Sequence, residues 1–472
     1  MRPRWSRRIW VVTRAMKRYL PVVGLGLAGL TFILSGCESG YSDAVKYGVR
    51  TDPLVTSKQG GDDIGDPVTE PDRPGVLPII KPDDVLRPEN PLHTRHVQKD
   101  KDLFQTDKLR DPMLISASDR QAIDTALTEF FGTPAEPKVA GLEADEREKL
   151  KLDDKTLKEG SRLYRIHCVH CHGVPGDGRG PTARWISPHP RDFRQGLFKF
   201  MSVDQAKGLS DLPPRRDDLY RTIRNGLEGT AMPAFLLLDE QHLQDLVSYV
   251  IHLSLRGKTE FDVIASDFKF KANNGKIAVA APDNIKNAAK DRFESAVEVW
   301  MKSQKPGAAI VVPDKYDWKF NKANPQNADD GEWQVWKGKD DEAKIKIRAA
   351  IAQAFFNDEE PKNADAKKIL ELRGEKTKEV NCKQCHEDYG RKAKFRFDRW
   401  GTLVRPNNFT AGVFRGGRRP ADIYHRIHSG INGSGMTQFG QNLSPNSIWD
   451  MVDFVQALSY PAMRKKMGIA ID

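Results

Sequence analysis

Two copies of one short cysteine pattern place the strongest limits on what this chain can fold into. The 472-residue sequence has five cysteines, and four of them lie at 168–172, which read Cys-Val-His-Cys-His, and at 382–386, which read Cys-Lys-Gln-Cys-His. Two thiols separated by two residues and followed by histidine are typical of covalent haem attachment. The thiols reach the two vinyl groups on one edge of a porphyrin, and the histidine turns its imidazole onto the iron.

Other uses of paired cysteines fit this sequence less well. A thioredoxin-like redox pair would need a βαβ pattern around it, and none is visible. A four-cysteine zinc ribbon would use both pairs together, but the pairs lie 214 positions apart (382 − 168). We therefore expect two covalently attached haems c. Their expected thioether cysteines are Cys168, Cys171, Cys382 and Cys385, and their expected proximal iron ligands are His172 and His386.

The fifth cysteine, Cys37, ends a segment typical of export. Residues 1–18 carry seven basic side chains and no acidic one, residues 19–34 form an apolar run, and Ser-Gly precedes the cysteine. This order predicts a signal peptide over 1–36, and its end resembles the lipobox of bacterial lipoproteins, which predicts lipidation of Cys37. An uncleaved membrane helix is the alternative, although the run is short for the about 20 residues that span a bilayer. Both interpretations put the bulk of the chain on the outer side of the membrane.

The basic charge of the whole chain does not indicate nucleic-acid binding. The sequence has 75 Lys and Arg against 65 Asp and Glu, a formal charge of +10. Seven of the basic residues lie in the expected signal, so the remaining chain has 68 (75 − 7) against 65, a charge of +3. We therefore exclude nucleic acid as a partner.

Composition divides the rest of the chain into four parts. Residues 37–105 hold many prolines, aspartates and glycines without apolar periodicity, so we expect a lipid-anchored, disordered and flexible tether. Residues 106–256 form the expected first domain, with an N-terminal helical extension at 117–131. Residues 257–340 are expected to be an irregular inter-domain segment, in which four tryptophans indicate packing against the haem units. Residues 341–472 form the expected second domain.

An internal repeat indicates which residue completes each iron site. Residues 218–235 and 422–439 are identical at seven of 18 positions with an offset of 204, and Met232 and Met436 lie in register. Methionine sulfur is a soft ligand that suits haem iron and raises its reduction potential. A single methionine is more often core filler, but these two are the only ones of ten that the repeat aligns. The competing candidates are Met201 for the first haem and His425 and His428 for the second.

These motifs together resemble class I c-type cytochromes, in which an attachment helix, the haem motif, a methionine loop and a closing helix follow one another. The resemblance covers about 150–256 and 360–465, and it implies an all-α fold with two tandem class I cytochrome c domains after a disordered tether. The second unit departs from the pattern, with Glu387 after its histidine and no Gly-Asp-Gly loop. The implied roles are thioethers for Cys168, Cys171, Cys382 and Cys385, proximal ligation for His172 and His386, and distal ligation for Met232 and Met436.

The resemblance implies electron transfer by irons that cycle between the ferrous and ferric states. We expect a dihaem electron carrier of a respiratory chain, anchored by lipid at the periplasmic face of the membrane. The partners implied are redox proteins: a quinol-oxidising complex, a dehydrogenase, an oxidase or a soluble cytochrome. Two alternatives remain. One is a dihaem peroxidase-like enzyme, in which one haem opens a coordination site, and the other is a fixed haem subunit of a larger respiratory complex.

Overall fold

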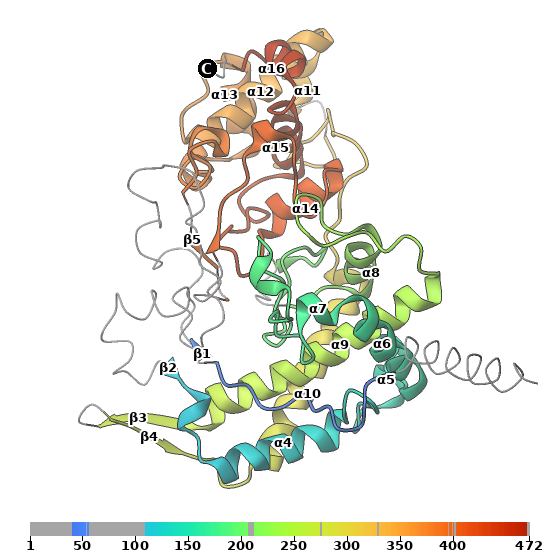
Figure 1. Cartoon of the computed structure of the whole chain (residues 1–472). Coiled ribbons are helices and arrows are strands. Elements are labelled where there is room, and N and C mark those ends of the chain that lie inside the picture. The colour runs from blue at the N-terminus through green and yellow to red at the C-terminus, as the bar shows by residue number, and fades with distance from the viewer. Residues whose placement is uncertain are drawn as a thin grey trace, which may run out of the picture.

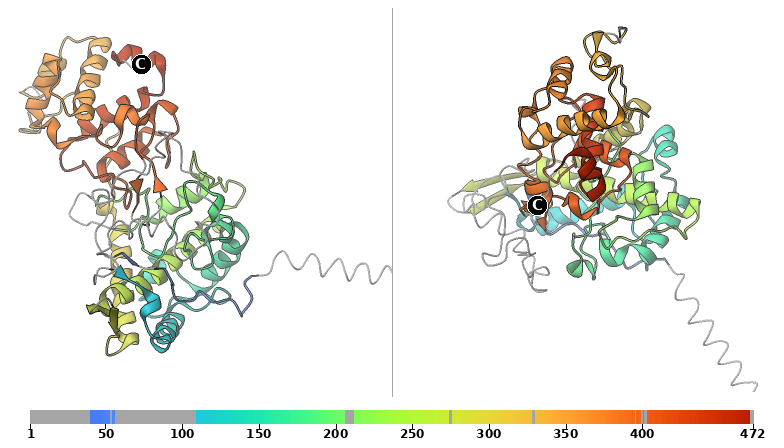
Figure 2. Two further views of the ribbon diagram at one scale, coloured as in Figure 1. Left: turned by 60° about the vertical axis from the view of Figure 1, so that its left-hand side comes forward. Right: turned by 90° about the horizontal axis from the view of Figure 1, so that it is seen from above.

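The computed structural model describes residues 40–52, 54–55, 109–205, 212–273, 276–327, 330–394, 396–398, 400 and 403–469. The expected signal peptide at 1–36, Cys37 and most of the expected tether lie outside the described residues. Helices dominate, and the strands form three two-stranded sheets, which confirms the all-α fold class. Figures 1 and 2 show two lobes, with the C-terminal one stacked on the other. None of the described helices combines the length and the apolar character needed to cross a membrane.

The first lobe is built around the crossing of two helices, α6 (Asp154–His167) and α9 (Glu240–Asp262). The Asp153 side chain caps α6 by accepting a hydrogen bond from the Thr156 backbone N–H at 3.0 Å. A β-carbon on Gly160 of α6 would stand 2.3 Å from the Asp245 carbonyl oxygen of α9, so glycine is what allows the helices to approach. The other elements are β1 (Leu54–Val55), β2 (Leu109–Arg110), α4 (Ala117–Phe131), α5 (Ala144–Leu150), α7 (Val169–His172), α8 (Arg216–Asn225), β3 (Lys269–Asn273), β4 (Lys276–Ala280) and α10 (Ile285–Gln304).

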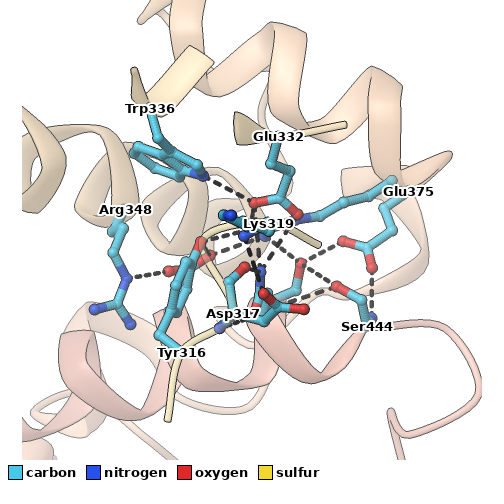
Figure 3. A network of polar contacts seen from close by, with 12 residues as sticks. Tyr316, Asp317, Lys319, Glu332, Trp336, Arg348, Glu375 and Ser444 are labelled. Atoms are coloured by element: carbon cyan, nitrogen blue, oxygen red, sulfur yellow. Dashed lines mark hydrogen bonds and ion pairs between the residues drawn. The ribbon is translucent and has the colours of Figure 1, made fainter. Parts of the chain in front are cut away.

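The second lobe is built around α12 (Asp341–Asn357) and α15 (Pro445–Ala457), which pack together through buried apolar faces. A buried polar network, part of which Figure 3 shows, ties residues 316–336 and α13 (Ala364–Arg373) to α15. Residues 316–336 are the stretch in which the sequence shows scattered tryptophans among polar residues. Because the network ties them to α15, this stretch belongs to the second lobe. The other elements are α11 (Trp333–Trp336), β5 (Arg396–Phe397), β6 (Leu403–Val404), α14 (Pro420–Ser429) and α16 (Pro461–Met467).

The first described part of the expected tether, residues 40–52, packs on the first lobe instead of extending freely. The Tyr47 hydroxyl lies 2.9 Å from the Tyr249 hydroxyl of α9, and the Arg50 backbone N–H donates to Glu260. Leu54 is buried as well. The partners lie more than 200 positions away in the sequence, so a local composition pattern does not predict this contact.

The expected irregular segment, 257–340, is also more ordered than its sequence indicated. Its first residues continue α9 to Asp262, and α10 packs on α9 and α4. The prediction of irregular structure is therefore wrong for α10, whose buried face follows helical spacing at Phe293, Ala296, Val297 and Trp300. The expectation that the tryptophans pack against the haem units agrees with the burial of Trp300 in the first lobe and of Trp336 in the second.

A buried histidine makes the first lobe sensitive to acid. His252 of α9 is fully buried, and its Nε2–H donates to the Phe131 carbonyl oxygen at 2.9 Å. Burial lowers the pKa of His252 to about 4, whereas an unfolded chain has a histidine pKa of about 6.5. Between these values the unfolded state binds the proton more readily, so stability contributed by neutral His252 is lost as the pH falls from about 6.5 towards 4.

We therefore expect His252→Gln, which keeps an N–H donor for Phe131, to flatten the acid side of the stability profile. Denaturant unfolding of both proteins across this pH range measures the effect. Equal losses of unfolding free energy in the parent and the variant would contradict the role given to His252.

Candidate haem sites

The two cysteine motifs form the same tight turn in different surroundings. In the first lobe, α6 ends at His167, and the His172 N–H then donates to the Cys168 carbonyl at 2.9 Å. In the second lobe no helix leads directly into the motif, yet the His386 N–H donates to the Cys382 carbonyl at 2.8 Å. In both lobes, one turn of backbone therefore brings the histidine back to the first cysteine of its motif.

All four motif cysteines are free, half-buried thiols. Burial, with a smaller contribution from the neighbouring Cys171, raises the pKa of Cys168 to about 12. Burial also raises the pKa of Cys382 to about 12, with Cys385 as the smaller cause. Redox-active and metal-binding cysteines work as thiolates in electropositive surroundings. Cys168 and Cys382 therefore lack the electropositive surroundings that a redox pair or a zinc site would need.

Each motif histidine is held in the tautomer that a metal ligand needs. The Nδ1 of His172 lies 3.1 Å from the Arg191 carbonyl oxygen, and the Nδ1 of His386 lies 3.1 Å from the Asn407 carbonyl oxygen. A carbonyl only accepts, so Nδ1 carries the proton, and Nε2 is the ring nitrogen that can bind a metal. Burial lowers the pKa of His172 to about 4, which keeps the ring neutral.

A phenylalanine stacks on each of these imidazoles. The rings of Phe193 and His172 lie 4.8 Å apart at 21°, and those of Phe409 and His386 lie 4.5 Å apart at 24°. The hydrogen bond through Nδ1 still lets each imidazole rotate about that bond. The stacked phenylalanine restricts this rotation. The sequence patterns did not lead us to predict the two carbonyl acceptors or the two stacked rings, which are Arg191, Asn407, Phe193 and Phe409. The signal was present, because residues 190–193 read Pro-Arg-Asp-Phe and residues 406–409 read Pro-Asn-Asn-Phe.

The two methionines predicted as distal ligands lie in turns of the same construction. The Leu227 N–H donates to the Met232 carbonyl, and the Ile431 N–H donates to the Met436 carbonyl, both at 3.1 Å. Each turn begins just after a glycine of positive φ, and a β-carbon on Gly430 would stand 2.4 Å from the Met436 carbonyl oxygen. Both methionines are half-buried. The repeat seen in the sequence is therefore a repeat of backbone geometry.

Two of the three competing ligands, Met201 and His428, are engaged elsewhere. Met201 is buried, and its sulfur accepts a hydrogen bond from the Gln205 side chain at 3.1 Å. His428 of α14 lies 3.7 Å from the Asp204 carboxylate of the first lobe, so it takes part in the contact between the lobes. His425 aligns with Arg221 in the repeat, so the first unit offers no imidazole at that place. These positions give no reason to replace Met232 or Met436 in the sequence-based assignment.

The loops after the motifs differ, as the absence of a Gly-Asp-Gly loop from the second unit indicated. In the first unit Gly173, Gly176 and Gly178 supply positive φ angles. In the second unit Asp388 and Tyr389 adopt positive φ at 52° and 57°, where such residues are uncommon. A β-carbon on Gly390 would stand 2.0 Å from the Asn407 carbonyl oxygen, so this glycine lets the acceptor of the His386 hydrogen bond come close.

The donor set fits haem c in both lobes. Each lobe offers two free thiols, one imidazole that binds a carbonyl through Nδ1, and one thioether in a defined turn. Apolar side chains surround these donors, and both Cys168 and Cys382 border the apolar core of their lobe. When bound, the haem would supply an iron that gains and loses one electron.

A protein-family model matches the two stretches of the chain that hold these sites. Residues 155–250 and 371–455 both match the family model described as cytochrome C oxidase, cbb3-type, subunit III, and each stretch holds one attachment motif and one methionine turn. The chain therefore contains cytochrome c sequence, which implies covalently bound haem c and haem-based electron transfer. No curated protein matches the chain. A chain of the Kuenenia stuttgartiensis reducing HAO-like protein complex is similar at 20% identity and a TM-score of 0.36, over 64% of this chain and 96% of that chain.

Proposed function

We propose that this protein is a dihaem c-type cytochrome that transfers electrons on the outer side of the cytoplasmic membrane, in a respiratory chain. The observation that carries the proposal is the twofold occurrence of one donor arrangement. In each lobe a Cys-x-x-Cys-His turn, an imidazole bound through Nδ1 to a carbonyl, and a methionine turn are built alike. An accidental motif would not bring along its supporting hydrogen bonds and stacked ring.

The chain's own residues set the behaviour of each iron. His172 and His386 are proposed as proximal ligands, and Met232 and Met436 as distal ones. Methionine ligation raises the reduction potential relative to a harder sixth ligand. The carbonyl acceptors of Arg191 and Asn407 make each imidazole more basic, which strengthens its bond to iron.

Location and anchoring are proposed from residues 1–37. A basic start, an apolar run and a cysteine after Ser-Gly support export and lipidation of Cys37. Maturation outside the cytoplasm agrees with covalent haem attachment, because c-type cytochromes resemble one another in maturing after export. The lipid would keep the lobes near membrane-bound redox partners.

Electron carriage is favoured over the two alternatives. The case for a fixed subunit depended on a tryptophan-rich middle segment that could serve as an interface, but Trp300 and Trp336 are buried within their own lobes. A peroxidase would need one iron with an exchangeable ligand, and the Met436 turn has the same hydrogen bond as the Met232 turn. We therefore propose redox partner proteins, donors and acceptors of one electron, as what the protein binds.

A haem count and a ligand count on the purified ferric protein test the proposal. The pyridine haemochrome assay should give two haems c per chain. The far-red charge-transfer band of methionine-ligated ferric haem, seen in absorption and magnetic circular dichroism, should have twice the intensity of a one-haem standard. One haem per chain would overturn the dihaem proposal. Two haems with one high-spin or bis-histidine signal would favour the peroxidase.

A further inference from the structure

The two lobes meet through positions that the repeat makes equivalent. The carbonyls that hold the two motif histidines belong to Arg191 and Asn407, which are 216 positions apart (407 − 191). The same separation relates Phe200 to Gly416, and these two are in contact, because a β-carbon on Gly416 would stand 2.3 Å from Phe200 Cδ1. Contact between equivalent positions is what a two-fold arrangement of the lobes produces. The segments that follow the two carbonyl acceptors therefore meet at the interface between the lobes.

One buried tryptophan joins the two sites across this interface. Trp400 of the second lobe is 5% exposed, and its Nε1–H donates to the Asp192 carbonyl of the first lobe at 3.1 Å. The Arg191 guanidinium carbon lies 3.6 Å from the centroid of the Trp400 ring. The ring also lies against the methionine turn of its own lobe, since a β-carbon on Gly433 would stand 2.4 Å from Trp400 Cζ3.

The carboxylate of Asp398 fixes this tryptophan. Its side chain is fully buried, lies 2.9 Å from Lys199 Nζ of the first lobe, and accepts the Trp400 backbone N–H at 3.1 Å. An ion pair that is removed from solvent in this way holds its partners strongly only when both are present. The position of the indole is therefore set by both lobes together.

These contacts form a nearly continuous bonded path between the two sites. The His172 imidazole donates to the Arg191 carbonyl, the next peptide group carries the Asp192 carbonyl, and this oxygen accepts the indole N–H of Trp400. The far side of the indole contacts Gly433, three residues before Met436. We propose that Trp400 is the residue that couples the two haem sites for electron exchange. This inference rests on the proposed dihaem function.

The electron balance of the exchange is simple. One electron leaves the reduced iron site of one lobe and arrives at the oxidised iron site of the other, and no bond is formed or broken. Trp400 itself is not oxidised, because the positive guanidinium of Arg191 over its ring opposes a radical cation there. The indole therefore keeps its proton and acts as a bridge.

A second contact across the interface, at Val413, provides a control. The Asn407 side chain donates to the Val413 carbonyl at 2.9 Å, and a β-carbon on Gly229, in the methionine turn of the first lobe, would stand 2.4 Å from Val413 Cγ1. Val413 is 37% exposed and aliphatic. Val413 thus contacts a methionine turn, as Trp400 does, but it has no ring and no side-chain donor to the opposite lobe.

The experiment measures electron exchange between the haems within one full-length holoprotein. Met436→His serves as the parent, because loss of methionine ligation lowers the potential of the second haem and makes the two haems distinguishable. Flash photoreduction with less than one electron per chain starts the reaction, and absorbance follows the re-equilibration. Trp400→Leu, Trp400→Phe and Val413→Ala are each made in this parent. Hydrogen exchange of the Trp400 indole N–H in the resting protein reports separately on the contact with Asp192.

We expect Trp400→Leu to slow the exchange at least about tenfold, within the roughly 100-fold that a 1 Å misplacement of reacting groups can cost. Trp400→Phe, which keeps a ring, should fall between Trp400→Leu and the parent, and Val413→Ala should match the parent. The indole N–H should be protected, and the rates should not depend on solvent viscosity. Trp400→Leu as fast as the parent would overturn the proposal. A slowed rate that becomes viscosity-dependent would also overturn it, because the loss would then come from motion of the lobes. Fewer than two haems per chain, counted beforehand, would instead overturn the dihaem function.

Discussion

Arg373→Ala is expected to lower the free energy of unfolding of the second lobe by about 3–5 kcal/mol, because it leaves the buried carboxylate of Glu332 without its counter-ion. Arg373 is completely buried at the end of α13. Its guanidinium binds Glu332 at 2.6 Å and Asp450 at 2.9 Å, and it donates to the Tyr316 hydroxyl at 2.6 Å. Figure 3 shows how Tyr316 and Glu332 converge in this network. One side chain therefore holds three separate segments of the lobe.

The effect should reach the haem site, because only residues 374–381 separate the end of α13 from the second attachment motif at 382–386. Chemical denaturation of the holoprotein, followed by the absorbance of the haem, measures the loss. The matched control is Lys346→Ala, which removes an exposed ion pair with Glu342 on α12. Such surface pairs contribute about 0–1 kcal/mol. A loss for Arg373→Ala no larger than that for Lys346→Ala would contradict a central role for the buried network.

Local sequence patterns predicted the parts of this structure that local physics determines. The helix expected at 117–131 is α4, with the same bounds. The Cys-x-x-Cys-His motifs form the expected turns, and the repeat offset of 204 places Met232 and Met436 in equivalent turns with equivalent hydrogen bonds. The helix and the motifs depend on residues within about one turn of one another. The methionine turns are found by comparing the two copies of the repeat, so all of these features are visible in the sequence.

Contacts between distant segments explain what the sequence did not reveal. Residues 40–52 pack on the first lobe because Tyr47 and Arg50 find partners on α9, and nothing in the local composition indicates those partners. Trp400 was not singled out, because its role depends on Asp192 and Gly433, which lie on opposite sides of it in space. By contrast, the repeated Pro-x-x-Phe spacing at 190–193 and 406–409 was available in the sequence and identifies the histidine acceptors.

Removing either methionine is expected to lower the reduction potential of the haem in its own lobe. Met232→Ala should do so in the first lobe and Met436→Ala in the second, each by on the order of 0.1–0.3 V, a fraction of the roughly 0.8 V that axial ligands can span. The physical reason is that methionine sulfur favours the ferrous iron, and alanine leaves the position to a harder ligand such as water. Potentiometric titration gives both potentials, and the far-red band should lose one of its two contributions in each variant.

Met201→Leu is the matched control for the first lobe. Met201 is a buried methionine of the same lobe, but its sulfur already accepts a hydrogen bond from Gln205. It should leave both potentials and the far-red band unchanged. If Met201→Leu removes the band and Met232→Ala does not, the distal ligand of the first haem is Met201 and the repeat has been misread. If Met232→Ala changes the first haem but Met436→Ala leaves the second unchanged, the two turns share a backbone without sharing a ligand. The departures of the second unit at Asp388 and Tyr389 would then mark a functional difference between the lobes.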